Sequence, residues 1–445
     1  MKKLSLLLTL TVAILLPHTR LSAQEYTRLS IHTDTAIVRS FEYQDGAIIY
    51  TQEAGQGRFH YHTLSSNEMM TIDLPNNIIV KDFEIYGNKI LNFCGYIPGN
   101  PDMAVVGHFC VCDLFSYTDP FRLYYAVLPE INGARINRLN RIDCSKRDLD
   151  DYTRFNVVAV GDWNGNGHCV VEIVPQSGIM LMGVTWDMGV VIASDDEIFD
   201  DVAITKNHFV TVSRIRDTVR LRCFVNSPEW TESHILTNDF WRTNIIQITC
   251  NPLSPYRITG LPNDSVIVVG YGVSPHQNIS ETQIFQLSCD NDFIYAGNLN
   301  YYFYAADNPV KDARYYISER RLNILQQNFQ VDGTSPDVLI SFWNSPTGPA
   351  SKITYTPFKT IYSFGEHEHY TDTVLMVGET PTLDLFLVKS LLFFPNNCTH
   401  RSNLSFDRAP IRYELNTNGS PMHTSFSVKE LILPIYEVPV NTICQ

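Results

Sequence analysis

The feature that most constrains the fold is a series of seven short apolar runs, each bounded by turn-forming residues. Glycine, asparagine, aspartate and proline close these runs, and this spacing is typical of strands and turns. The runs are Ala47–Tyr50, Ile90–Phe93, Val157–Val160, Phe209–Val212, Val266–Val269, Val338–Ser341 and Val374–Val377. The clearest helical candidate is the short segment around Ile317–Gln327. The sequence therefore predicts an all-β protein.

Some of these segments repeat with a common frame. Residues from Phe41 to Ile49 align without gaps with residues from Phe83 to Leu91, 42 positions later. The segment Asp201–Ile204 is a third copy, which matches Asp82–Ile85. A period near 40 residues with hairpin content resembles the blades of β-propellers, which take roughly 40–50 residues each. In such a ring, Phe41, Phe83 and Val202 should occupy equivalent positions in three sheets.

The predicted architecture is a single β-propeller over residues 24–445, with seven blades of antiparallel sheet. Six or eight blades, or tandem β-sandwiches, are the alternatives. Residues 398–445 are expected to form a C-terminal closing segment.

The N-terminus has the three parts of a secretory signal. Two lysines in Met1–Lys3 precede an apolar run from Leu4 to Leu16, and the small residue Ala23 follows. The run is shorter than the ~20 apolar residues that a membrane-spanning helix needs. We therefore expect a signal peptide over residues 1–23, export, and no transmembrane segment. Four triplets, at Asp34, Asp217, Asp264 and Asp372, resemble the Asp-Ser/Thr-aliphatic O-glycosylation acceptor of one group of Gram-negative bacteria. The expected location is the periplasm, cell surface or exterior of such a bacterium.

Charge and cysteine content exclude some classes of function. The formal net charge is -14. A protein that binds nucleic acid needs clustered Lys and Arg for phosphate contacts, so nucleic acid is excluded as a partner. The ten cysteines are irregularly spaced, without any Cys-x-x-Cys, and several lie inside strand-like apolar runs. Buried thiols are therefore favoured over a disulfide framework. Cys398 with Cys444 is the pair expected if one forms.

One loop resembles a metal-binding repeat. Asp162, Asn164 and Asn166 alternate between two apolar strands, and Gly167 follows them. The segment resembles the FG-GAP type of propeller repeat, whose hairpin loop binds calcium, and the three residues match its first three ligand positions. The later acidic ligand of that family falls on Val170 here. The resemblance implies a calcium site at Asp162, Asn164 and Asn166, and the alternative is an Asn-Gly hairpin without metal.

Other candidate groups are histidine pairs and carboxylate runs. His60/His62 and His367/His369 could each offer two imidazoles to a metal, although exposed strand or loop histidines are the commoner outcome. The runs Asp150–Asp151, Asp195–Glu197 and Asp200–Asp201 are interpreted as solvated loop charges, because adjacent strand residues point to opposite faces. Common enzyme signatures such as Gly-x-Ser-x-Gly and His-Glu-x-x-His do not occur. No catalytic residue is therefore assigned.

The leading functional hypothesis is an exported, non-enzymatic monomer that binds a ligand, either a protein or a glycan, on the loop-rich face around a central channel. A secreted carbohydrate-active enzyme with dispersed carboxylates is the first alternative, and a scaffold component of an envelope assembly is the second.

Overall fold

The computed structural model describes residues 25–444 apart from 30, 32, 42–45, 64–67, 87–89, 115–120, 145–156, 165–166, 176–184, 194–195, 206–207, 226–242, 262–263, 274–279, 291–292, 305–307, 317–320, 328–336, 346–347, 355–358, 367–372, 380–384, 392–404, 407–410, 417–421 and 439. The predicted signal peptide lies outside these residues. In the described part of the chain, no helix is long and apolar enough to cross a membrane.

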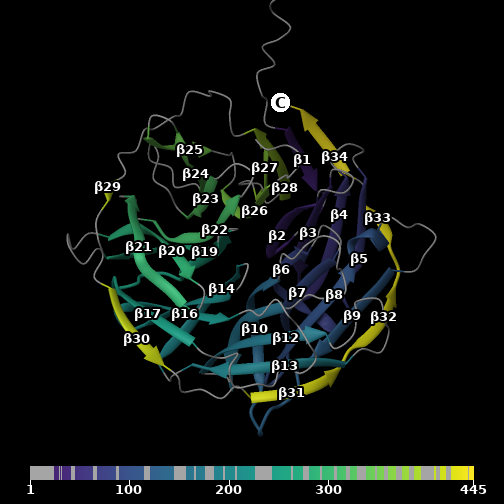
Figure 1. The fold of residues 1–445 in the computed structure, drawn as a ribbon. Coiled ribbons are helices and arrows are strands. Elements are labelled where there is room, and N and C mark those ends of the chain that lie inside the picture. The colour runs from purple at the N-terminus through teal and green to yellow at the C-terminus, as the bar shows by residue number, and fades with distance from the viewer. Residues whose placement is uncertain are drawn as a thin grey trace, which may run out of the picture.

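The described strands pair into seven sheets, six with five strands and one with four, and every pairing within them is antiparallel. The sheets are arranged radially around a central axis (Figure 1). Innermost strands of neighbouring sheets contact one another around most of the ring. The first innermost strand, β2 (Thr35–Phe41), also contacts the last, β26 (Thr360–Glu366), so the first and last sheets meet. This arrangement is a β-propeller and not a pair of sandwiches, which confirms the predicted fold class.

The sheets are numbered here in chain order, each from its innermost strand outwards. Sheet 1 contains β2 (Thr35–Phe41), β3 (Gly46–Glu53), β4 (Gln56–Thr63) and β5 (Met69–Asp73). Sheet 2 contains β6 (Ile79–Tyr86), β7 (Ile90–Ile97), β8 (Met103–Cys110) and β9 (Phe121–Val127). Sheet 3 contains β10 (Ile136–Cys144), β11 (Val157–Trp163), β12 (Gly167–Pro175) and β13 (Thr185–Ile192). Sheet 4 contains β14 (Glu197–Ile204), β15 (His208–Ile215), β16 (Thr218–Val225) and β17 (Thr243–Thr249).

The remaining sheets follow the same plan. Sheet 5 contains β18 (Arg257–Leu261), β19 (Ser265–Val273), β20 (Ser280–Asp290) and β21 (Phe293–Tyr304). Sheet 6 contains β22 (Val310–Tyr316), β23 (Arg321–Gln326), β24 (Val338–Ser345) and β25 (Gly348–Thr354). Sheet 7 contains β26 (Thr360–Glu366), β27 (Thr373–Glu379), β28 (Leu385–Leu391) and the N-terminal strand β1 (Glu25–Leu29). The described helical elements are two 3-10 turns, η2 (Pro75–Asn77) and η3 (Val111–Leu114).

The C-terminal region runs around the outside of the ring. Its strands are β29 (Ser405–Phe406), β30 (Ile411–Asn416), β31 (Met422–Ser427), β32 (Lys429–Leu433), β33 (Tyr436–Val438) and β34 (Val440–Cys444). They form the outermost strands of sheets 5, 4, 3, 2, 1 and 7, in that order (yellow in Figure 1). We call these six strands the C-terminal belt. The last of them, β34, pairs with β1, so both ends of the described chain lie in sheet 7.

The seven apolar runs of the sequence lie in seven different sheets. Six of them fall on the second strand of a sheet, and Val338–Ser341 falls on the third strand of sheet 6. Second strands are covered on both faces because each sheet packs between two neighbours, so their residues are buried consecutively instead of alternately. Strand β3 shows this pattern, with six buried residues in succession from Gly46. Such runs therefore mark the core of the ring.

Two expectations from the sequence are wrong in detail. The segment read as helical contains β23, and all six residues of this strand are buried in the second position of sheet 6. Burial on both faces removes the two-residue alternation that identifies a strand. The ungapped alignment of Phe41 with Phe83 also fails. Phe41 is the last residue of β2 and pairs with Gly46, whereas Phe83 lies in the middle of β6 and pairs with Phe93.

Phe83 and Val202 do occupy equivalent positions. Each follows an aspartate whose Oδ1 accepts a hydrogen bond from the next backbone N–H, and each comes three residues after the last regular pair before a β-bulge, at Val80 and at Phe199. Both side chains are buried, in different sheets.

Candidate functional site

The central channel is lined by polar side chains from the innermost strands. Five of these strands contain a β-bulge, and a polar or charged residue follows each one. A bulge changes the direction of the side chain that follows it. Strand β10 contains two bulges, which are followed by Arg138 and Arg141. The residues that directly follow the bulges of the other four strands are Asp82, Asp201, Asp312 and Ser363. The same backbone irregularity therefore brings functional groups of five sheets to the axis.

Aspartates on three innermost strands connect neighbouring sheets. In each, one carboxylate oxygen accepts a hydrogen bond from the next residue's N–H, and the other oxygen accepts from a backbone N–H of the following sheet. These inter-sheet bonds are Ile142 N to Asp82 Oδ2 (3.3 Å), Ile204 N to Asp143 Oδ2 (2.7 Å) and Ile258 N to Asp201 Oδ2 (3.2 Å). Thr259 takes the same role between sheets 5 and 6, since its Oγ1 accepts from Tyr315 N at 3.3 Å. These contacts hold adjacent sheets in register around the channel.

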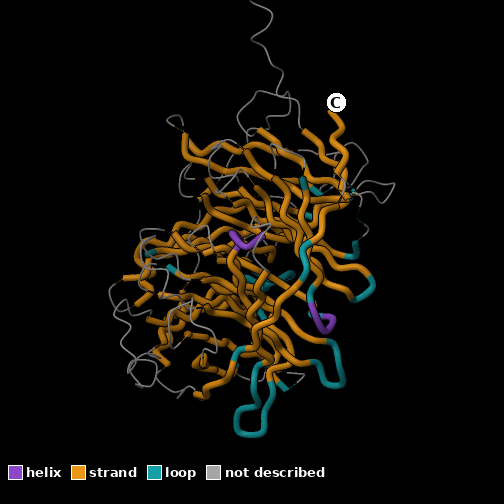
Figure 2. Tube along the Cα trace, turned by 90° about the vertical axis from the view of Figure 1, so that its right-hand side faces the viewer, coloured by secondary structure: helices purple, strands orange, loops and turns teal. Residues whose placement is uncertain are grey.

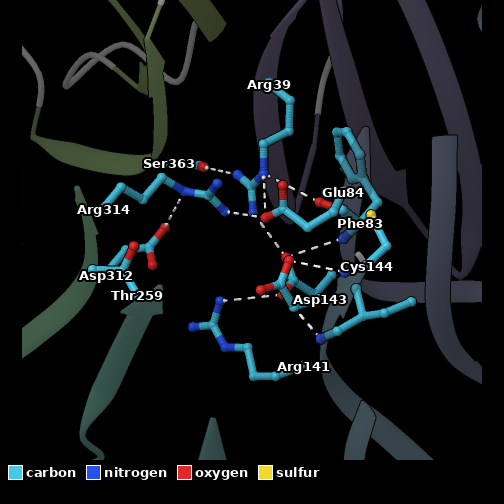
Figure 3. Close-up of polar contacts among 12 residues, drawn as sticks. Arg39, Phe83, Glu84, Arg141, Asp143, Cys144, Thr259, Asp312, Arg314 and Ser363 are labelled. Atoms are coloured by element: carbon cyan, nitrogen blue, oxygen red, sulfur yellow. Dashed lines mark hydrogen bonds and ion pairs between the residues drawn. The ribbon is translucent and has the colours of Figure 1, made fainter. Parts of the chain in front are cut away.

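Arg39 ties three sheets together at one side of the channel (Figure 3). Its Nη2 is 2.8 Å from Oδ1 of Asp82, and its Nε is 3.3 Å from Oε1 of Glu84. Its Nη1 donates to Ser363 Oγ at 3.3 Å. The side chain is 5% exposed. Arg39 belongs to sheet 1, the two carboxylates to sheet 2 and Ser363 to sheet 7, so this guanidinium fixes the place where the ring closes.

A second arginine crosses the channel. Nη2 of Arg314, on β22, lies 2.7 Å from Oε1 of Glu84, on β6. Sheets 6 and 2 are not neighbours in the ring, so this ion pair spans the axis (Figure 3). Arg314 Nε is also 3.6 Å from Oδ2 of Asp312 on its own strand. The channel is therefore bridged by an Arg39–Glu84–Arg314 network.

A cavity of about 50 Å³ lies beside this network. Carboxylates of Asp82, Asp143, Asp201 and Asp312 line it together with the guanidinium of Arg141. Nη1 of Arg141 is 3.9 Å from Oδ2 of Asp82. The volume is enough for a few water molecules, because one water needs about 10–15 Å³ by this measure. The cavity can therefore hold water or one small polar group.

The channel carboxylates differ in acidity. Burial raises the pKa of Asp201 to about 6 against the opposing influence of Arg141 and Arg257. Burial also raises the pKa of Asp82. For Asp312, burial is outweighed by nearby guanidinium groups, of which Arg314 contributes most, and its pKa lies below the ordinary value. The charge of Asp201 therefore changes close to neutral pH.

Some carboxylates that were interpreted as solvated loop charges are instead buried. Asp200 and Asp201 point to opposite faces as expected, but Asp200 accepts from Arg214 Nε at 2.6 Å and from Tyr256 N at 2.9 Å. Glu197 is fully buried in sheet 4, where it pairs with Arg220 and Arg222 and accepts from Ser213. Buried arginine partners satisfy these acids, which is why they do not need solvent. Asp195, and the run Asp150–Asp151, lie outside the described residues.

The first histidine pair is also buried, contrary to expectation. His60 lies between two threonines, with Nε2 2.6 Å from Thr51 Oγ1 and Nδ1 2.8 Å from Thr71 Oγ1. His62 is 1% exposed. Burial lowers the pKa of His60 to about 3, so the ring is neutral at ordinary pH. His367 and His369 lie outside the described residues.

The predicted calcium loop forms the expected strand-turn-strand, with Trp163 paired to Gly167. Asn164 occupies a left-handed backbone conformation (φ 49°) at the turn, and its Oδ1 accepts from Arg135 N at 2.9 Å. Asp162 Oδ1 accepts from Asn140 Nδ2 at 3.1 Å. Asn166 lies outside the described residues. The turn exists, and the metal remains a prediction.

Seven of the described cysteines carry thiols that are not in disulfides. Cys94, Cys144, Cys169, Cys223 and Cys250 are buried, as the sequence favoured, whereas Cys110 and Cys112 are partly exposed. Cys398, one half of the expected pair, lies outside the described residues.

No protein-family model matches the chain, and no curated protein matches it. Among solved structures, the WD40 domain of Toxoplasma gondii coronin is similar, with 9% identity and a TM-score of 0.45 over 85% of this chain and 87% of that one. The β-propeller domain of the Trilobed protease from Pyrococcus furiosus is also similar, with 10% identity and a TM-score of 0.39 over 83% and 98% of the two chains.

Proposed function

We propose that this protein is an exported, non-enzymatic β-propeller that binds a protein or glycan on one face of the ring. The observation that supports the proposal is that the carboxylates of the central channel are engaged by groups of neighbouring sheets. Asp82, Asp143 and Asp201 are occupied by backbone N–H groups of adjacent sheets, and Glu84 is held between two arginines. These contacts hold neighbouring sheets in place, which supports a structural role for the channel and leaves binding to one face of the ring.

The binding face can be specified from the topology. In antiparallel sheets, the turns between second and third strands lie on the same side as the connections from one sheet to the next. The described segments on that side are 53–56, 75–77, 97–103, 128–135, 215–218 and 250–256, and we call it the connection face. Loops that project beyond the strands are teal in Figure 2. Leu253, 50% exposed, is a large apolar side chain on this face.

Site-specific photocrosslinking tests the binding face. A photoreactive residue in place of Leu253 should give crosslinked products in the cells that make the protein. The matched control is the same residue at Ile432, which is 64% exposed but lies on the belt at the ring's outer edge. Crosslinks from position 432 with none from position 253 would move the binding surface to the rim and contradict the proposal.

A carbohydrate-active enzyme remains the second candidate, and one observation favours it. Asp201 lies beside the cavity with a pKa of about 6, which suits a general acid near neutral pH. If this candidate is correct, the protein should release reducing ends from a polysaccharide, and Asp201→Asn should remove that activity while retention of the polysaccharide persists. For the proposed non-enzymatic protein, we expect that a bound polysaccharide is retained and that no reducing ends are released.

Export is part of the proposal and has its own test. The charged, apolar and small-residue segments of residues 1–23 support cleavage after Ala23. The mature protein should therefore begin at Gln24, one residue before β1. N-terminal sequencing of protein recovered outside the cytoplasm measures this directly, and an intact Met1 in that fraction would refute it.

A further inference from the structure

Two cysteines of sheet 2 form a pair of neighbouring thiols on a tight turn. Cys110 is the last residue of β8, and Cys112 lies in the 3-10 turn η3 that follows. Both are partly exposed, whereas Cys94, Cys144, Cys169, Cys223 and Cys250 are buried. The turn is anchored by Val111 and Leu114, which are 0% and 1% exposed and pack in the core shared by sheets 1 and 2. Val111 lies between the two cysteines and Leu114 follows two residues after Cys112, so buried side chains anchor a turn on which both thiols are partly exposed.

The two thiols contact each other. A side-chain hydrogen bond joins Cys110 and Cys112, and it is the largest of the influences that raise the pKa of Cys110, ahead of burial. Both influences disfavour a thiolate on Cys110. The first attack of the exchange is therefore assigned to Cys112.

The spacing also suits a covalent bond. Residues i and i+2 in a tight turn have Cα atoms about 5–6 Å apart, within the ~4.4–6.8 Å that a disulfide bridges. A ring closed over one intervening residue is small, and strained or exposed disulfides are the ones that reduce easily.

We propose that Cys110 and Cys112 are a reversible dithiol–disulfide exchange site for low-molecular-weight disulfides such as oxidised glutathione. The Cys112 thiolate attacks one sulfur of the disulfide, which forms a mixed disulfide and releases one thiolate. Cys110 loses its proton and attacks the Cys112 sulfur, which closes the ring and releases the second thiolate. Two protein thiols are oxidised by two electrons, the external disulfide is reduced to two thiols, and the two protons pass to the leaving groups.

Alkylation after equilibration in glutathione buffers tests the site on the full mature chain. Trypsin releases Ile90–Arg122 as one peptide, because no Lys or Arg lies between these ends. The peptide also contains Cys94, which is buried and serves as an internal control. With rising oxidised glutathione, the peptide should change from three alkyl groups to one, because the two sulfurs of the ring carry no hydrogen to replace, and the Cys94 thiol should still be alkylated after unfolding. Reduced glutathione should reverse the change.

Variants separate ring closure from general thiol reactivity. Cys110→Ser should stop the reaction at a glutathione adduct on Cys112, and Cys223→Ser, at a buried position, should behave as the unsubstituted protein. A melting curve for each variant confirms that it is folded. Two outcomes overturn the proposal: both thiols stay reduced in fully oxidised glutathione, or the unsubstituted protein accumulates mixed or intermolecular disulfides without the ring.

Discussion

Arg314 on β22 and Glu84 on β6 are joined by a 2.7 Å ion pair that crosses the central channel between sheets that are not neighbours in the ring. Both side chains are about four-fifths buried, at 21% and 18% exposure. The pair is therefore a mostly buried connection across the channel and not a surface ion pair. We call it the strut, because it holds sheets 2 and 6 at a fixed distance.

Removing the strut should cost stability. Arg314→Gln leaves Glu84 paired with Arg39 alone, and we expect a loss of about 1–3 kcal/mol in the free energy of unfolding, because a mostly buried carboxylate loses a charged partner. The control is Arg216→Gln, which breaks the exposed pair with Asp196 and should change stability by less than about 0.5 kcal/mol. Urea unfolding of the three proteins measures both, and equal effects would contradict the strut.

Phe83→Ala should create a cavity in the core between sheets 1 and 2. Phe83 is fully buried, and its ring meets that of Phe59 edge-on at 5.4 Å. A loss of about 3–5 kcal/mol is expected, typical of a deleted core aromatic. Ile432→Ala, which truncates an apolar side chain that is 64% exposed, should change the unfolding midpoint little. A small effect of Phe83→Ala would mean that the sheets repack around the gap.

Acid should destabilise the fold partly through His60. Burial lowers its folded pKa to about 3, against an unfolded value near 6.5. A lowered histidine pKa favours the neutral ring in the folded state, so its contribution is complete above pH 6.5 and is lost as pH falls toward 3. The share is roughly 4–5 kcal/mol at pH 3.

The measurement is the free energy of unfolding against pH for the unsubstituted protein and for His60→Gln. Glutamine can still bond Thr51 and Thr71 but does not titrate, so its curve should fall less steeply between pH 6.5 and 3. His108, whose pKa burial lowers to about 4, contributes in the same direction and should leave residual acid sensitivity in the variant. Parallel curves would exclude the role of His60.

The calcium prediction is tested by thermal denaturation. If calcium binds at Asp162, Asn164 and Asn166, the melting temperature should rise with calcium concentration, since a ligand selective for the folded state stabilises it by mass action. Asp162→Ala should abolish the rise, and Asp217→Ala, in the turn between β15 and β16, should preserve it. A flat titration of the unsubstituted protein would leave a turn without metal.

The core strands could be predicted from the sequence because a strand buried on both faces has a run of consecutive apolar residues. Each of the seven apolar runs belongs to a different sheet, and Val266–Val269, for example, is the buried centre of β19. The belt left no such signal. Strand β32 consists of exposed and half-buried residues, and its position follows from backbone pairing with β9, which no local pattern encodes.

The channel was missed although part of its signal was present. The alignment of Asp82 with Asp201 rested on a shared aspartate, and that residue makes the inter-sheet bond in both sheets. Its partners, Ile142 and Ile258, are about 60 residues away along the chain. The charge next to it in sequence, at Asp200, suggested a solvated pair. Only the bulge between Phe199 and Asp201 turns one carboxylate to the axis and the other to Arg214.

The reversed path of the belt has a consequence for synthesis. During translation, sheets 1 to 5 emerge in order, but the strands that cover their outer edges come last and in the opposite order. Residue 25 meets its final neighbour, Cys444, only when almost the whole chain has been made. Sheet 1 therefore has an unpaired outer strand, β5, for the longest time during synthesis. An unpaired strand edge can pair with a strand of another chain. Nascent chains stalled before residue 405 should therefore be the most prone to associate.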